Sequence, residues 1–164
     1  MSRPNLAIHQ EVQATGVSDF YQAPSVLAVV NPQDQDVQVL IRLTAPISAG
    51  PDVETHEAGE EVEYWISPGG VLQLATASAS SCEPDFVEPE TRECSLGTDC
   101  QFSYCRLEDF DLTGTEITAS LPVAVFGGHD CAFVPYSIWA CDHLEEQLFP
   151  YETWGRQFVV NQSR

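Results

Sequence analysis

Two short motifs of mirrored order hold the side chains that are best suited to chemistry. The motifs His129-Asp130-Cys131 and Cys141-Asp142-His143 offer two imidazoles and two thiols within fifteen positions or so. Such a set can bind zinc tetrahedrally, and a cysteine beside a histidine can act as a nucleophile. Both uses require reduced cysteines. One interpretation is therefore a metal-binding domain or zinc-dependent enzyme that uses His129, Cys131, Cys141 and His143.

The number and spacing of the cysteines favour a different interpretation. The chain has 6 cysteines and no Cys-x-x-Cys pair, a pattern more typical of disulfides in an exported protein than of a zinc site. We therefore expect a Cys131–Cys141 disulfide, which closes a loop of ~11 residues and contributes about 2.8 kcal/mol by the chain-entropy rule. Three pairings are open for the other cysteines. These are Cys82, Cys94, Cys100 and Cys105.

Carboxylates near one another suggest a possible cation ligand set. Asp34 lies close to Asp36, and Glu108 lies close to Asp109 and Asp111. Hard oxygen atoms at such spacing suit calcium, although neither group has the EF-hand pattern and a solvated turn explains both. Apart from this calcium, we expect no cofactor.

Other motifs argue against catalysis. Gly127-Gly128 lacks the frame of a phosphate-binding loop, so we predict a turn with positive φ there. No Gly-x-Ser-x-Gly elbow occurs. We predict that the chain is not an enzyme. Trp139 and Trp154 are expected to serve in core or edge packing, and the alternative is an exposed pair that grips a protein or glycan.

The charge balance excludes several classes of partner. The chain has 164 residues, with 25 acidic side chains against 6 basic ones, all of them arginine, and a net charge of -19. Such a surface repels nucleic acids and anionic membranes. No apolar run is long enough to span a membrane, and the start MSRPNLAIHQ has no signal-peptide core. We expect a single β-rich module, residues 1–164, cut from a longer secreted or cell-surface protein whose export signal was removed or lies upstream. The oligomeric state is not predicted.

Alternating apolar residues predict an all-β fold. Residues 25–30 and 37–43 are expected to pair as a hairpin, and 61–66 with 71–76 as another around a type II turn at Ser67-Pro68-Gly69-Gly70. Further strands are predicted at 115–120, 121–127 and 156–160. The 121–127 strand is apolar on both faces and is expected to be internal.

Two segments depart from this strand pattern. A capping-box variant, Asp142 with Glu145, predicts a short helix that presents Cys141, Leu144 and Leu148 on one face. Residues 77–109 hold four cysteines and little apolar periodicity, so we expect a disulfide-rich insertion. The predicted fold is a set of antiparallel, sandwich-like or propeller-like sheets with one short helix and this insertion.

Three segments also resemble a known family. The segments PVAVFGGHDC (122–131), ACDHLEEQLFP (140–150) and WGRQFVV (154–160) resemble the N-terminal domain of the IgGFc-binding protein family, and DLTGTEITAS (111–120) resembles its lead-in. The resemblance implies an all-β, disulfide-bearing, secreted domain of a kind found in mucus-type animal proteins and bacterial surface proteins. Since the family domain normally continues further, it also implies a partial domain, and the lysine-free composition suggests a bacterial member.

The resemblance implies a non-catalytic binding or adhesion module. Its expected partner is a protein or glycan at an extracellular surface, with no nucleic acid and no membrane insertion. A structural spacer between binding domains is the alternative. No residue of this chain can be assigned to Fc binding from the resemblance.

Overall fold

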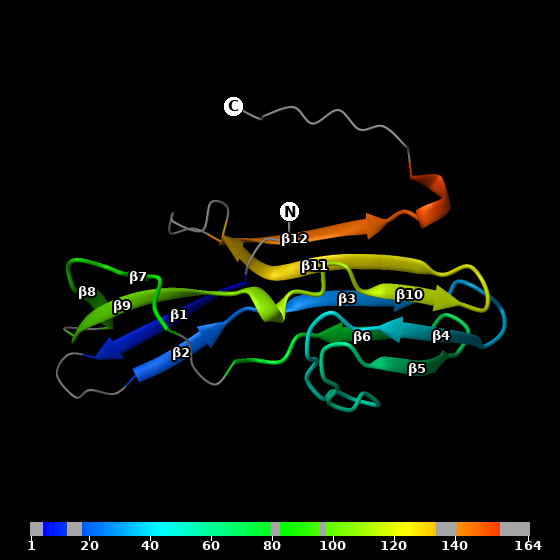
Figure 1. Ribbon diagram of the computed structural model, residues 1–164, viewed down its shortest axis with the longest axis horizontal. Helices are drawn as coiled ribbons and strands as arrows, with labels where there is room; N and C mark the ends of the chain where they lie inside the picture. Colours follow the sequence, from blue (N-terminus) through cyan, green and yellow to red (C-terminus); the bar gives the residue numbers. More distant parts are fainter. Residues whose placement is uncertain (1–4, 13–17, 80–82, 96–97, 134–140, 155–164) are drawn as a thin grey trace.

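The part of the chain that the structure describes folds into three antiparallel sheets, so the predicted all-β class is confirmed (Figure 1). The computed structural model describes residues 5–12, 18–79, 83–95, 98–133 and 141–154. Within these ranges the helical elements are two 3-10 turns, Glu108–Phe110 (η1) and Tyr151–Thr153 (η2). No helix in the described ranges is long and apolar enough to cross a membrane.

Two of the sheets form a sandwich. The four-stranded sheet has the order β12 (Cys141–Leu148), β11 (Ala124–Phe133), β3 (Ser25–Val30), β6 (Val71–Ala75). The three-stranded sheet has the order β10 (Glu116–Ala119), β4 (Val37–Arg42), β5 (Glu61–Ile66). The sandwich form of the prediction is therefore the correct one.

The main core lies between these two sheets. Strand β4 alternates as predicted, since Val37, Val39 and Ile41 are fully buried while the residues between them are not. Strand β3 alternates in the same way. The other sheet supplies matching apolar side chains, and burial of each contributes roughly 1.5–3 kcal/mol. The buried cluster includes Leu27, Val29, Val62, Ile66, Leu72 and Leu74.

The two predicted hairpins are wrong. Strand β3 pairs with β11 and β6, and β4 pairs with β10 and β5, so the 31–36 loop connects the two sheets. The 67–70 turn likewise carries the chain from β5 into β6 of the facing sheet. Both connections are arches, that is, they link strands of the two facing sheets and not neighbouring strands of one sheet. Alternation fixes which face of a strand is buried, but it does not say which strand lies beside it.

The turn at residues 67–70 is confirmed as type II. Gly69 has φ 68°, and the amide of Gly70 donates to the carbonyl of Ser67 at 2.8 Å. Asn31 joins this arch to the 31–36 arch. It is fully buried, its Nδ2 donates to the carbonyl of Ile66 at 2.7 Å, and its amide donates to the carbonyl of Gly70 at 3.0 Å.

The helix predicted after Cys141 is wrong. Residues 141–148 form strand β12, which pairs antiparallel with β11. Leu144 and Leu148 are four residues apart, a spacing that puts side chains on one face of a helix and also on one face of a strand. The spacing therefore could not distinguish the two structures.

The glycine turn predicted at 127–128 is also wrong. Both glycines lie inside β11, opposite Leu27 and Val26 of β3, and neither has positive φ. A side chain on Gly128 would overlap the backbone carbonyl of Leu144 in β12. Glycine here allows β12 to approach β11 closely. Strand β11 lies between β12 and β3, so the central position predicted for the 121–127 strand is confirmed. The strand itself begins at Ala124, and its residues 124–129 are only half-buried, so the predicted cover on both faces is incomplete.

The third sheet contains the cysteine-rich segment. Its strands are β1 (Asn5–Val12), β2 (Ser18–Gln22), β7 (Phe86–Val87), β8 (Arg92–Ser95) and β9 (Thr98–Leu107). Strand β9 pairs with β1 along its length, as well as with β7 and β8. The segment is thus more regular than its weak periodicity predicts.

Cys100 and Cys105 of β9 are buried and disulfide-bonded. Cys94 lies in β8, whereas Cys82 and the predicted strand 156–160 lie outside the described residues. Two cysteines five positions apart on one strand are too distant to bond to each other. This leaves the pairings of Cys100 and Cys105 with Cys82 or Cys94 as predictions.

Candidate functional site

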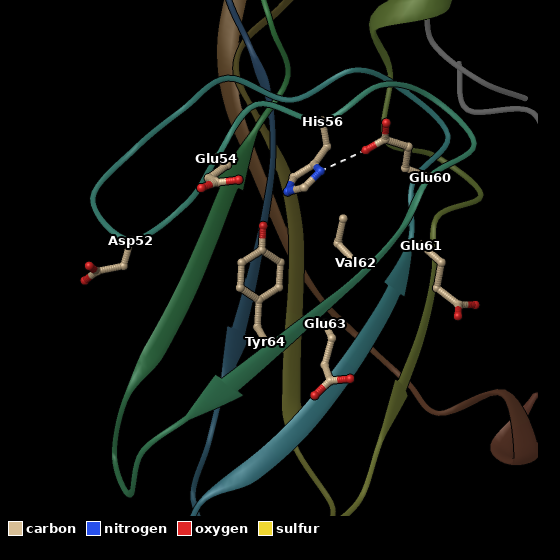
Figure 2. Close-up of a pocket in the computed structure, with 8 residues that line it drawn as sticks. All are labelled: Asp52, Glu54, His56, Glu60, Glu61, Val62, Glu63 and Tyr64. Atoms are coloured by element: carbon tan, nitrogen blue, oxygen red, sulfur yellow. Dashed lines mark hydrogen bonds and ion pairs between the residues drawn. The ribbon is translucent and has the colours of Figure 1, made fainter.

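An acidic groove opens between the 48–60 loop and strand β5. It is a hollow of about 630 Å³, and Figure 2 shows its lining. Five carboxylates line it, and its one basic side chain is an imidazole. The lining residues are Asp52, Glu54, His56, Glu60, Glu61, Val62, Glu63 and Tyr64.

The loop is held by short backbone bridges. Ile47 pairs with His56 across it, and Gly50 pairs with Val53. The amide of Leu43 donates to the carbonyl of Glu60 at 2.9 Å, which fixes the end of the loop beside strand β4. The acidic side chains are therefore carried on an ordered scaffold, which lowers the entropy cost of binding.

Tyr64 forms the floor of the groove. Its ring packs against the core, and its hydroxyl points toward Glu54 and His56 (Figure 2). The hydroxyl oxygen is buried and has no hydrogen-bond partner among the described residues. Burial, followed by the charge of Glu54, raises the pKa of Tyr64. The hydroxyl thus stays protonated at neutral pH, and a ligand that accepted its hydrogen bond would relieve a buried unpaired group.

One side-chain hydrogen bond lies inside the groove. His56 Nδ1 lies 2.8 Å from Glu60 Oε2. The remaining lining carboxylates, those of Asp52, Glu54, Glu61 and Glu63, have no cationic partner among the lining residues. Since like charges on low-dielectric walls add, the groove attracts cations and basic side chains.

The zinc set proposed from the sequence is not assembled in the described part of the chain. Cys131 and Cys141 are joined by a disulfide with a Cα–Cα distance of 5.0 Å, as predicted. Bonded sulfurs are not thiolates, so two of the four zinc ligands are removed. The same bond removes the thiol that the Cys/His nucleophile requires.

The two histidines of this motif have separate surroundings. His129 Nδ1 accepts a hydrogen bond from the amide of Cys131 at 3.2 Å, and His143 Nε2 lies 3.7 Å from Glu145 Oε2. Burial lowers the pKa of His129, while the charges of Asp111 and Asp130 oppose this shift. Neither arrangement orients an imidazole toward a nucleophile.

The described carboxylates among those proposed for calcium do not gather into a ligand cluster. Asp34 and Asp36 are exposed on the 31–36 arch. Asp111 Oδ1 accepts hydrogen bonds from the amide and hydroxyl of Thr113, at 2.8 and 2.7 Å, in a turn beside Asp109. No group of three or more potential metal ligands occurs among the residues with described positions.

Of the two tryptophans considered as packing or partner-binding residues, the structure describes one. Trp139 lies outside the described residues, whereas Trp154 is 61% exposed and does not pack in the core. Its ring lies 5.6 Å from that of Tyr151, and its Nε1 donates to the carbonyl of Phe149 at 3.1 Å. Of the two packing roles predicted for Trp154, in the core or at an edge, the core role is therefore wrong.

A polar cluster in the third sheet escaped the sequence reasoning. The Tyr104 hydroxyl donates a short hydrogen bond to Glu88, and Arg92 Nε donates to the same carboxylate at 3.2 Å. Arg92 also lies 3.9 Å above the ring of Phe102. Burial and the bond to Glu88 raise the pKa of Tyr104 to about 12. All its charges are paired, so this cluster stabilises the sheet and offers no open site.

The groove was also missed. The 45–61 segment is visibly acidic, but an acidic loop is usually a solvated one, and no motif separates a concave acidic loop from a flat one. The available signal was Glu61, Glu63 and Trp65 in alternation, which marks a solvent-facing side of β5 next to the acidic loop.

Comparison with known proteins supports the resemblance found in the sequence. A segment of 50 residues, 30% of this chain, is 48% identical to the human IgGFc-binding protein, of which it spans 1%. This relative gives no support to a bacterial source. No solved structure matches the chain. Residues 8–164 match the family described as IgGFc binding protein, and the chain therefore belongs to this family.

Proposed function

We propose that this chain is a non-catalytic binding module of an extracellular protein, with a protein as its ligand. Membership of the IgGFc binding protein family carries the proposal. The oxidised Cys131–Cys141 pair supports it, because disulfides persist in oxidising compartments. The human relative is named for the Fc region of IgG, so Fc is the first ligand to test.

We place ligand binding at the acidic groove. Its unbalanced carboxylates suit a basic segment of the partner, and the unpartnered Tyr64 hydroxyl supplies a hydrogen-bond donor at its floor. A net charge of -19 would speed the approach of a basic surface over long range. The acids also explain why nucleic acids and anionic lipids are unsuitable partners.

Surface plasmon resonance with the immobilised chain tests the proposal. The analytes are Fc fragment and a panel of basic and acidic extracellular proteins, followed by a glycan array. We expect saturable binding of a basic protein surface, and its affinity should fall as salt is raised from 50 to 300 mM or so.

Two variants with equal charge change separate the groove from general electrostatics. The double substitution Glu54→Gln and Glu61→Gln removes two charges from the groove and should weaken binding about tenfold, which corresponds to about 1.4 kcal/mol. The double substitution Asp34→Asn and Asp36→Asn removes two charges from the 31–36 arch and should change affinity by less than about twofold. Equal losses for both pairs would contradict a groove site.

A further outcome would overturn the binding proposal as a whole. If neither the protein panel nor the glycan array shows saturable binding, a structural spacer is the better description. Calcium, which the sequence suggested at Asp34 and Asp36, is included by repeating each titration with calcium and with a chelator. If the affinity or the melting temperature depended on calcium, the cation would be a ligand of the binding module.

A further inference from the structure

Strand β12 is the last strand at one end of the four-stranded sheet. It pairs with β11 along one edge, and no described residue pairs with its other edge, which we call the outer edge. All 8 of its residues are exposed. The Cys131–Cys141 disulfide and the close backbone approach at Gly128 hold β12 against β11. An outer edge that is ordered in this way can accept a further strand at little entropy cost.

Alternate residues of β12 direct their backbone groups toward the outer edge. The carbonyl oxygen of Leu144 lies against the backbone of β11. Since backbone groups alternate along an antiparallel strand, those of the odd-numbered residues point away from β11. The amide of His143 donates to Oδ1 of Asp142 at 2.9 Å, which agrees with this direction. The backbone groups of Glu145 and Gln147 are therefore the ones that a partner strand can reach.

The side chains of β12 show which residues would suit an added strand. Leu144 and Leu148 lie on the inner side of the sheet with Val125, which packs on the core. These leucines are 37% and 47% exposed. Glu145 lies on the opposite side of the strand. Because neighbouring strands interact through side chains of the same face, an added strand would place apolar residues beside the leucines and basic residues beside Glu145.

Charge favours a basic partner over a second copy of this chain. Residues 141–154 contain 4 acidic side chains and neither lysine nor arginine. The acidic residues are Asp142, Glu145, Glu146 and Glu152. A second copy paired at the same edge would set like charges beside one another, and it would bring its own net charge of -19. A segment that carries lysine or arginine would meet opposite charges instead.

Exposed aromatic rings follow at the end of β12. Phe149, Tyr151 and Trp154 are 72%, 79% and 61% exposed. Figure 1 shows η2 at the end of β12, on the side away from β11. Hydrogen bonds fix this turn, since the hydroxyl of Thr153 donates to the carbonyl of Pro150 at 2.7 Å. A strand added along the outer edge would meet these rings, which can contact an apolar side chain or lie beneath a basic one.

We propose that the outer edge of β12 and the rings of residues 149–154 bind an extended segment of a partner protein in which apolar and basic residues alternate. The segment adds as a strand beside β12 through backbone hydrogen bonds to Glu145 and Gln147, and its side chains supply the specificity. This site is independent of the acidic groove, because the groove is lined by β5 and the 48–60 loop.

Binding of a model peptide tests the proposal. The probe is a short peptide of alternating lysine and valine with blocked ends. We expect saturable binding to the full chain by calorimetry, and slower hydrogen exchange in residues 143–148. The same peptide with all its backbone amides methylated keeps its charge and side chains, and it should bind at least about tenfold more weakly. Equal affinities, or no saturable binding of the unmodified peptide, would overturn the proposal.

Substitutions at Gln147 test the same edge from the side of the chain. Gln147→Pro removes an amide that points away from β11, where proline is tolerated, and it should weaken peptide binding about tenfold. Gln147→Ala keeps the amide and should change affinity by less than about twofold. If Gln147→Pro does not fold, the methylated peptide decides the question.

Two other results would also overturn the proposal. Loss of peptide binding in the Glu54→Gln and Glu61→Gln double variant would place the peptide in the acidic groove. Dimerisation of the chain that disappears in Gln147→Pro would show that a second copy occupies the edge.

Two tryptophans of similar exposure test the aromatic part of the site. Trp154 is 61% exposed and Trp65, in β5, is 64% exposed, and the indole N–H of each donates a hydrogen bond. Trp154→Ala should weaken peptide binding about fivefold, whereas Trp65→Ala should change it by less than about twofold. Equal losses would contradict a role of the rings in this site.

Discussion

Adding a single methyl group to Gly127 or to Gly128 should have opposite effects on stability. Both residues lie inside β11 between β3 and β12, and both have negative or extended φ. The three atoms nearest to a Cβ on Gly127 all belong to the Leu148 side chain, at 3.5 Å or beyond, which is an ordinary contact distance. A Cβ on Gly128 would overlap the Leu144 carbonyl oxygen and lie 3.4 Å from the Glu145 Cα.

The size of the difference follows from these contacts. Gly127→Ala keeps every native contact and reduces the entropy of the unfolded chain, so it should stabilise the protein by about 0.5 kcal/mol. Gly128→Ala must push the backbone of β12 away from β11, and overpacking of this kind costs about 2 kcal/mol. With a shift of roughly 2–4 °C in Tm per kcal/mol for a chain of this size, the two variants should differ in Tm by about 5–10 °C.

Thermal unfolding by circular dichroism gives both Tm values. Hydrogen exchange by mass spectrometry then locates the change, since loss of β12 from the sheet would speed exchange in residues 141–148 of Gly128→Ala alone. Because the Cys131–Cys141 bond keeps β12 tethered to β11, hydrogen exchange in β12 can become faster without a separate unfolding transition of this strand.

Equal Tm shifts for the two variants would contradict the close approach of β12 to β11 at Gly128. A tight turn with positive φ at both glycines would make each alanine costly, which is the structure that the sequence first suggested. If Gly127→Ala lowered the free energy of unfolding by more than about 1 kcal/mol, the result would therefore favour a turn at these glycines and argue against the close pairing of β11 with β12.

Three further predictions follow from the fold. Replacing Cys131 and Cys141 by serine should lower the free energy of unfolding by about 2–3 kcal/mol, measured by urea titration, and an unchanged value would argue against the loop closure. Asn31→Ala removes three side-chain hydrogen bonds from a buried site and should cost about 3 kcal/mol, whereas Gln33→Ala should cost less than about 1. Because the pKa of Tyr104 is raised from 10.0 to about 12, its contribution to stability is complete below pH 10 and is lost as pH rises to 12. Between pH 10 and 12 the free energy of unfolding of Tyr104→Phe should therefore fall by about 1–2 kcal/mol less than that of the wild type. Parallel pH profiles of the unfolding free energy would refute the raised pKa.

Alternation predicted which residues are buried better than which strands are neighbours. Val37, Val39 and Ile41 were assigned to one face and are fully buried together. The type II turn at 67–70 was also predicted from Pro68 and Gly69, because each residue type has a fixed backbone preference. Whether such a turn closes a hairpin or an arch depends on the facing sheet, and a local pattern carries no information about it.

The errors at the end of the chain have a common cause. The segment CDHLEEQL is rich in helix-forming residues, yet it pairs with β11, and tertiary context overrides weak intrinsic propensity. Gly127-Gly128 is a frequent turn signal, but here the glycines serve close packing between strands. Both errors arise because the partner of a strand is set by contacts far along the sequence.

The candidate site was predictable only in part. The Cys131–Cys141 bond followed from the count and spacing of cysteines. The groove needed the fold, because it forms where the 48–60 loop turns back over β5 and buries the hydroxyl of Tyr64. Composition revealed the excess of acid but not its concentration in a hollow.

Peptide mapping of the native protein without reductant shows whether Cys131 and Cys141 are oxidised, as the proposal of an extracellular binding module requires. After alkylation of any free thiols, we expect a peptide pair joined through Cys131 and Cys141, no label on either cysteine, and no stoichiometric zinc by metal analysis. Alkylation of both residues together with one bound zinc per chain would contradict the proposal, since it would show that these cysteines serve a metal centre.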